Sequence, residues 1–188
     1  MKIVAFSTSP RKDANTETLL RHILEGAKQA GAETRLFRLN ELSIKGCQAC
    51  MYCRGHEGCA IKDDMQSLYA EIDSADAIVI GSPIYMWNLN AQAKTFIDRL
   101  YPYLKPDYTS KVNIPTLLAI TQGQPAPDTF KTSLENAAGV LNFLGFKVKD
   151  VIVEGGCYAK DDLAKRDTAI QKAILTGQAL VTHAQSWA

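Results

Sequence analysis

Apolar residues recur along the chain with two periods that alternate from one segment to the next. Lys2–Ser7 is a short apolar run that predicts a β-strand, and the apolar positions from Leu19 to Ala27 follow the period of a helix that Gly31 ends. The alternation continues to the C-terminus. Further strands are expected at 34–39, 77–80, 116–121 and 148–154, and further helices at 64–72, 91–104, 129–144 and 161–183.

This order of elements predicts an α/β fold. The strand at 77–80 is apolar at successive positions, which suits a parallel strand that is covered on both faces. Five strands joined by right-handed helical crossovers give a doubly wound, five-stranded parallel sheet in one domain, 1–188. Ligands of such sheets bind beyond the carboxyl ends of the strands, so the loops after the first, third and fourth strands are the candidate binding loops.

Composition and charge exclude several classes of partner. The 188 residues carry 21 Lys and Arg against 20 Asp and Glu, and this balance predicts neither nucleic-acid nor membrane-surface binding. We find no run of about 18 apolar residues that would span a membrane, and the N-terminal apolar stretch is too short for a signal peptide. We therefore expect a cytoplasmic protein, in which clustered cysteines serve metal or redox chemistry rather than disulfides.

The loop after the first strand, STSPRKDANTETLL, is rich in hydroxyl side chains and runs directly into a helix. It lacks both the dinucleotide fingerprint and the nucleoside-triphosphate loop. A phosphate monoester would instead be held by backbone N–H groups at the helix start together with side chains of the loop. Those side chains are Ser7, Ser9, Arg11, Asn15 and Thr16. The alternative is that Asn15 or Thr16 is simply the N-cap of the helix.

The loops after the third and fourth strands offer further candidate contacts. Gly81 and Pro83 predict a tight turn, and Tyr85 with Trp87 would present aromatic faces for a flat ligand. Alternatively, these aromatic residues pack on a neighbouring subunit or helix. The loop TQGQPAPD, which begins at Thr121, lies either beside a ligand or in an ordinary turn.

Four cysteines gather in one loop, at about 45–63. Four thiolates suit zinc or an iron-sulfur cluster, and free or regulatory thiols are the third possibility. Structural zinc sites draw on two C-x-x-C pairs about 15 to 20 residues apart, whereas here three cysteines overlap as C-x-x-C-x-x-C, a spacing that favours a cluster. The candidate ligands are Cys47, Cys50, Cys53 and Cys59, while His56 is expected on the surface and Cys157 to be structural or incidental.

Together these loops resemble the flavodoxin-like, NAD(P)H-dependent FMN reductase superfamily. Within it, the cysteine loop resembles that of the iron-sulfur flavoproteins. In that family an acidic pair commonly follows the cysteine motif, as Asp63 and Asp64, then Met65, do here. The resemblance implies strand order 2-1-3-4-5 with the cysteine loop inserted after strand 2, and the cofactors FMN and a [4Fe-4S] cluster. It implies phosphate contacts from Ser9, Arg11, Asn15 and Thr16, ring contacts from Pro83, Ile84, Tyr85, Trp87 and Asn88, and a third contact from 121–124, including Thr121 and Gly123.

The function expected from these features is electron transfer by a redox flavoprotein that binds FMN and a [4Fe-4S] cluster. The cofactors carry the chemistry, so no catalytic acid or base is named. An electron-carrier protein such as a ferredoxin, or NAD(P)H, would donate electrons to a small-molecule acceptor. The cysteine loop is expected near the phosphate loop, in the same subunit or across a homodimer or homotetramer. The alternatives are a cluster-free NAD(P)H-dependent FMN or quinone reductase and a regulatory binding module with a zinc or disulfide loop.

Overall fold

A parallel β-sheet forms the centre of the computed structural model, which describes residues 1–187. Its strand order is β2-β1-β3-β5-β6, which becomes the predicted 2-1-3-4-5 when only the five parallel strands are counted in chain order. The sequence did not predict β4 (Asn88–Leu89), which pairs antiparallel with the end of β3. The parallel strands are β1 (Lys2–Ser7), β2 (Glu33–Arg38), β3 (Ala77–Tyr85), β5 (Ile114–Thr121) and β6 (Phe146–Glu154).

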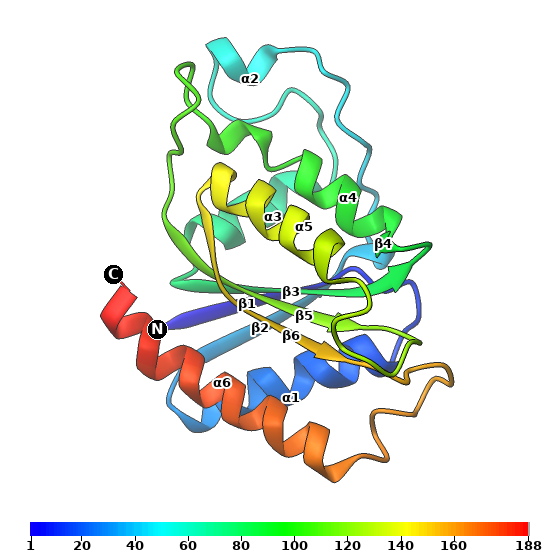
Figure 1. Ribbon diagram of the computed structural model, residues 1–188. Coiled ribbons are helices and arrows are strands. Elements are labelled where there is room, and N and C mark those ends of the chain that lie inside the picture. The colour runs from blue at the N-terminus through cyan, green and yellow to red at the C-terminus, as the bar shows by residue number, and fades with distance from the viewer. Residues whose placement is uncertain (188) are drawn as a thin grey trace.

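Helices cover both faces of the sheet, and each face has its own apolar cluster (Figure 1). One face is covered by α1 (Asn15–Gln29) and α6 (Asp167–Trp187), and the other by α3 (Met65–Asp73), α4 (Ala91–Asp98) and α5 (Lys131–Leu144). Short turns complete the fold: the 3₁₀ turns η1 (Leu39–Glu41) and η2 (Tyr101–Tyr103), and the one-turn helix α2 (Tyr52–Gly55).

Glycines bring α1 and α6 together at close range. A Cβ atom at Gly26 would collide with the backbone carbonyl of Ile174, and one at Gly177 would collide with the carbonyl of Ile23. Because the two backbones touch at these points, no larger residue fits there without moving a helix.

Three sequence predictions need correction. The tight turn predicted at Gly81 and Pro83 is wrong, because both residues continue β3 and pair with Ala119 and Thr121 of β5. The helix predicted at 91–104 ends at Asp98, and a 3₁₀ turn containing Pro102, which cannot continue an α-helix, follows. The last helix begins at Asp167 instead of residue 161.

No helix within residues 1–187 is both long and apolar enough to cross a membrane. The features that position the candidate site are the loops that leave β1, β3, β5 and β6 at their carboxyl ends and the long segment that joins β2 to α3.

Candidate functional site

A cavity of about 50 Å³ lies where the loops after β1, β3, β5 and β6 converge. Its position beyond the strand ends matches the place where such sheets bind ligands. Most of the residues predicted from the sequence line it: Ser9, Arg11, Asn15, Thr16, Pro83, Ile84, Tyr85, Thr121 and Gly123. Three predicted residues do not, because Ser7 is buried at the end of β1 and Trp87 and Asn88 lie further out.

The N-terminus of α1 faces this cavity without a side-chain cap. Ala14 is the N-cap residue, and no side chain of the described residues caps the first-turn N–H groups. The alternative in which Asn15 or Thr16 acts as the cap is therefore wrong, since both lie inside the helix. Uncapped first-turn N–H groups and the helix dipole together favour an anion at this end.

Asn15 and Thr16 join α1 to other loops of the site. The Asn15 amide donates to the Ala159 carbonyl at 2.7 Å and accepts from the Leu163 N–H at 2.9 Å, so it fixes the segment between β6 and α6. The hydroxyl groups of Thr16 and Thr121 lie 2.7 Å apart and hydrogen-bond each other. These contacts position the cavity walls.

Arg11 supplies the positive charge at the cavity. Its Nη1 donates to the carbonyl of Tyr158 at 3.2 Å, and its backbone N–H donates to the Ser9 hydroxyl at the same distance. The side chain is otherwise exposed, so its remaining donors are available to a ligand.

Glu17 holds the loop after β1 against α1, and the sequence analysis did not identify it. Its carboxylate accepts from the Asp13 N–H at 3.1 Å and from Nε of Arg38 at 2.7 Å, and Arg21 pairs with it as well. Burial opposes ionisation, but these donors outweigh it and lower the pKa of Glu17 to about 2. The available signal was its place in the first helical turn, where acids are favoured.

Asn90 is a second positioning residue that the sequence analysis did not identify. As N-cap of α4, its Oδ1 accepts from the Ala93 N–H at 3.1 Å. The same oxygen accepts from the Thr8 hydroxyl at 2.8 Å, and Nδ2 donates to the Thr8 carbonyl at 2.7 Å. One buried amide therefore ties the loops after β1 and β3 together. An asparagine directly before the helix predicted at 91–104 was the available signal.

The turn after β3 lies between Tyr85 and Asn88, which pair as the ends of a two-residue hairpin. Met86 and Trp87 both have positive φ, 45° and 68°, a conformation that bulky residues seldom adopt. Trp87 packs edge-on against Phe130 with ring centroids 6.1 Å apart, yet it stays 70% exposed. The turn thus holds large side chains at the rim of the cavity.

Gln122 lines the cavity and carries an unsatisfied polar atom. The residue is 2% exposed, and its Nε2 donates to the carbonyls of Gln124 and Ala126. Since both partners are acceptors, the orientation of the amide is fixed. Its Oε1 is buried and has no hydrogen-bond partner in the described part of the chain, so a ligand donor would satisfy it.

Cys157 also lines the cavity, a position that its isolation in the sequence did not reveal. Its Sγ accepts from Nη2 of Arg166 at 3.0 Å. Burial raises the pKa of this thiol, and Arg166 only partly offsets the effect. A half-buried thiol of this kind remains protonated near neutral pH and behaves as a packing residue.

The cysteine loop is closed at its base by two acidic residues. The Asp63 carboxylate accepts from the Lys45 N–H at 2.9 Å, and that of Asp64 accepts from the Ser43 N–H at 2.7 Å. On α3, Gln66 donates to the carbonyls of Cys59 and Ile61. Asp63 and Asp64, the acidic pair of the family resemblance, therefore hold the two ends of the cysteine loop together.

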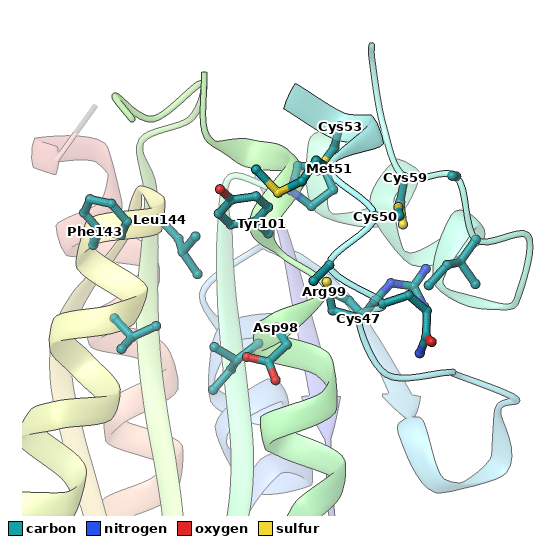
Figure 2. A pocket seen from close by; sticks show the side chains of 17 residues that line it. Cys47, Cys50, Met51, Cys53, Cys59, Asp98, Arg99, Tyr101, Phe143 and Leu144 are labelled. Atoms are coloured by element: carbon teal, nitrogen blue, oxygen red, sulfur yellow. The ribbon is translucent and has the colours of Figure 1, made fainter. Parts of the chain in front are cut away.

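The four loop cysteines line a second, larger cavity of about 430 Å³. Figure 2 shows their side chains on one side of it and Phe143 and Leu144 of α5 on the other. Burial raises the pKa of Cys53, and the neighbouring thiols add to the rise. Within the described residues, no group of three His, Cys, Asp or Glu side chains lies close enough together to hold a metal ion, so the four sulfurs do not converge on one point.

Four cysteine sulfurs are a ligand set that suits either a zinc ion or an iron-sulfur cluster. Zinc requires all four sulfurs at about 2.3 Å from one centre, whereas a cluster accepts ligands around a larger volume. Ala49 and Met51, on either side of Cys50, have positive φ of 50° and 60°. Left-handed residues of this kind turn backbone N–H groups toward a common point, as in anion-binding nests at iron-sulfur sites.

The short helix α2 is anchored through Arg54. Its guanidinium lies 4.3 Å from the ring centroid of Tyr108 and 5.5 Å from that of Tyr101, and Nη2 donates to the Pro106 carbonyl at 2.6 Å. His56 stacks on Tyr52 and is exposed, as predicted for a surface histidine.

The two cavities lie in different parts of the molecule. In Figure 1 the cysteine loop with α2 lies above α4 and α5, whereas the loops after β1, β3 and β6 lie at the right-hand edge of the sheet. No residue among 1–187 lines both cavities. The cysteine loop therefore does not adjoin the loop after β1 within one chain, and its expected place near that loop across a subunit interface stays a prediction.

Similarity to known proteins agrees with this geometry. An iron-sulfur flavoprotein of Methanosarcina thermophila is 35% identical over 120 residues, which cover 64% of this chain and 63% of that protein. Another from Archaeoglobus fulgidus is 40% identical over 106 residues, covering 56% and 54%. The chain spans about half to just under two thirds of the length of the curated relatives it matches.

The fold is shared with a solved FMN-dependent NADH-azoreductase of Bacillus anthracis. That structure superposes with a TM-score of 0.72 at 15% identity and covers 96% of this chain and 100% of its own. A family model described as NADPH-dependent FMN reductase matches residues 1–141, about three quarters of the chain. The chain therefore belongs to the NADPH-dependent FMN reductase family.

Proposed function

We propose that the chain is a redox flavoprotein that binds FMN against the loops at the strand ends, with the phosphate at the N-terminus of α1, and a [4Fe-4S] cluster in the cysteine loop. The observation that carries the first part is the uncapped N-terminus of α1 beside Arg11 and the buried, unsatisfied Oε1 of Gln122. A phosphate dianion suits the first pair, and an N–H or O–H donor of the same ligand suits the second. Family membership supports FMN as that ligand.

Each wall of the cavity has a separate task in holding FMN. First-turn N–H groups and Arg11 would bind the phosphate, while Pro83, Ile84 and Tyr85 offer surface to the flavin ring. Asn90 and Glu17 hold the loops in place. Bound FMN supplies the capacity to accept and release electrons, and the protein controls its position and exposure to solvent.

The four loop cysteines are the proposed ligands of the cluster. The overlapping spacing of the first three cysteines, the left-handed backbone beside Cys50 and the names of the relatives support a cluster over zinc. The cluster supplies single-electron chemistry, and the loop supplies four sulfur ligands and backbone donors.

Separate cavities in one chain favour electron exchange between subunits. We therefore include a homodimer or homotetramer in the proposal, with the cysteine loop of one copy facing the flavin of another. NAD(P)H or an electron-carrier protein such as a ferredoxin would donate electrons, and a small molecule would accept them. A cytoplasmic location fits the cysteines, all five of which are unpaired.

The leading alternative is a cluster-free FMN or quinone reductase. This alternative accounts for the cavity at the strand ends but gives no function to the closed cysteine loop. A zinc-dependent or disulfide-dependent regulatory module is the other alternative, and it leaves Arg11 and Gln122 unexplained.

Anaerobic purification followed by absorption spectroscopy and analysis for iron, sulfide and zinc separates these proposals. We expect flavin bands over a broad cluster absorbance, with iron and sulfide in similar amounts. Flavin without iron would support the cluster-free reductase. Zinc without flavin would contradict both parts of the proposal.

A further inference from the structure

Arg99 follows α4 directly, and its side chain is fully buried beneath the cysteine loop. Its Nη1 donates to the Lys45 carbonyl at 2.8 Å and to Asp63 Oδ2 at 2.6 Å, and its Nη2 donates to Asp63 Oδ1 at 3.0 Å. Lys45 precedes the first loop cysteine and Asp63 follows the last. One guanidinium therefore joins both ends of the loop.

The third nitrogen of this guanidinium has no acceptor. Nε of Arg99 is buried and has no hydrogen-bond partner within residues 1–187. Arg99 also lines the cavity that the four cysteines surround, and Figure 2 shows it beside Cys47. A buried donor on a charged group is costly to leave unpaired, so the position calls for an acceptor inside this cavity.

The chemistry of the cavity indicates which acceptor this is. The carboxylate of Asp63 already accepts from Arg99, from the Lys45 N–H and from the Met65 N–H, so it does not serve the free donor. Besides Arg99 and the four cysteines, the side chains with polar atoms that line the cavity are Gln48, Asp98 and Tyr101, and Asp98 is paired with Lys94. Thiolates, together with the inorganic sulfide of a cluster, are anionic and accept N–H hydrogen bonds.

Arg54, which lies within the cysteine loop itself, anchors α2 and does not face the cavity. It also has a buried unpaired nitrogen, but it does not line the cavity, and its charge lies over two tyrosine rings. The combination of full burial, loop closure and a free donor at the cavity wall is specific to Arg99.

We propose that Arg99 is a positioning residue for the group bound by the four cysteines, and that its Nε–H donates to a sulfur of that group and favours its reduced form. A fixed positive charge with a hydrogen bond to sulfur stabilises the more negative, reduced state and so raises the reduction potential. This inference rests on the proposed cluster.

The test compares two variants with a matched control in anaerobically prepared protein. Arg99→Lys keeps the charge and removes Nε, and the double variant Arg99→Gln/Asp63→Asn removes both charges without leaving a buried carboxylate unpaired. Lys131→Gln removes an exposed cation of α5 that does not line the cavity. Iron content, thermal unfolding and the midpoint potential of the cluster are measured for each.

We expect both Arg99 variants to retain iron and to have more negative midpoint potentials than wild type and Lys131→Gln. The expected change for Arg99→Lys is roughly tenfold in the ratio of reduced to oxidised cluster at a fixed potential, about 59 mV for a one-electron couple. If the double variant does not fold, Arg99→Lys decides the question.

Two results would overturn the inference. One is an unchanged midpoint potential in iron-loaded Arg99 variants. The other is Arg99 variants that fold and bind FMN but contain no iron. That result would show that Arg99 only holds the ends of the loop together. Absence of iron and sulfide from wild-type protein is a different outcome, because it refutes the proposed cluster itself.

Discussion

At the scale of single residues, the sequence identified side chains whose type alone suggests chemistry. Arg11, Thr16 and the four loop cysteines were predicted in this way, and the structure places each set around one cavity. Gln122 lies within the predicted 121–124 contact, whereas Glu17 was missed because its role depends on a partner elsewhere in the chain. Arg38, which pairs with Glu17, is 21 residues away and lies on a different element. No local pattern reports such a contact.

Replacing Arg11 with alanine is expected to weaken FMN binding by roughly 10- to 150-fold, the worth of a hydrogen bond to a charged group, about 1.5 to 3 kcal/mol. Affinity is measured by quenching of flavin fluorescence. Lys12→Ala is the control, because Lys12 is adjacent and exposed but does not line the cavity. Equal losses in both variants would show that only general charge matters.

Protonation of Glu17 is expected to destabilise the fold in acid. Its pKa falls from 4.5 to about 2 on folding, so its contribution is complete above pH 4.5 and is lost as the pH falls toward 2. The contribution is about 1 to 3 kcal/mol, because the half-exposed Arg21 is screened by solvent. The free energy of unfolding of wild type minus that of Glu17→Gln should shrink over this range. A difference that stays constant from pH 7 to about 3 would contradict the assignment.

At the scale of elements, predictions succeeded where a local pattern decides the structure and failed where a distant contact does. Lys2–Ser7 was predicted to the residue because continuous apolarity suits a buried parallel strand. Gly81 was assigned to a turn, but it lies in β3. A glycine stands there because Leu20 of α1 packs in the space that a Cβ would occupy. The residues before Asp167 were assigned to a helix, but Asn15 and Asp162 hold the loop there.

Two helical glycines are expected to respond to alanine with opposite signs. Gly177→Ala should lower the free energy of unfolding by about 1 to 3 kcal/mol, because the new methyl group meets the carbonyl of Ile23 on α1. Gly139→Ala on α5 should raise it by up to about 1 kcal/mol, because the space there is open and alanine favours helix. Chemical denaturation measures both. Stabilisation by Gly177→Ala would show that the helices pack less closely than described.

Within the cysteine loop, Cys50→Ala is expected to abolish iron binding and leave FMN binding intact, because the two cavities share no residue among those described. Cys157→Ser serves as the control and should keep full iron. Metal analysis and flavin fluorescence provide the readouts. Full iron in Cys50→Ala would end the four-ligand assignment, and parallel loss of FMN would show that the two sites depend on each other.

At the scale of the whole molecule, the alternation of strands and helices was sufficient to predict a parallel sheet covered on both faces, and the family resemblance supplied the order of its strands. The separation of the two cavities was not predictable, because the direction in which the insertion at about 45–63 folds depends on tertiary contacts. Arg99 and Gln66 draw the cysteine loop onto α3 and α4, away from the strand ends. Electron exchange between the two proposed centres therefore depends on how the subunits assemble.

The central claim is that the N-terminus of α1, with Arg11, forms a site for the phosphate of FMN. The most direct test compares the affinity of the purified protein for FMN with its affinity for riboflavin, which has the same ring and no phosphate. We predict that FMN binds at least roughly 100-fold more tightly, since a dianion at a helix N-terminus makes several charge-assisted hydrogen bonds. Equal affinities for the two flavins, or no binding of either, would contradict the account.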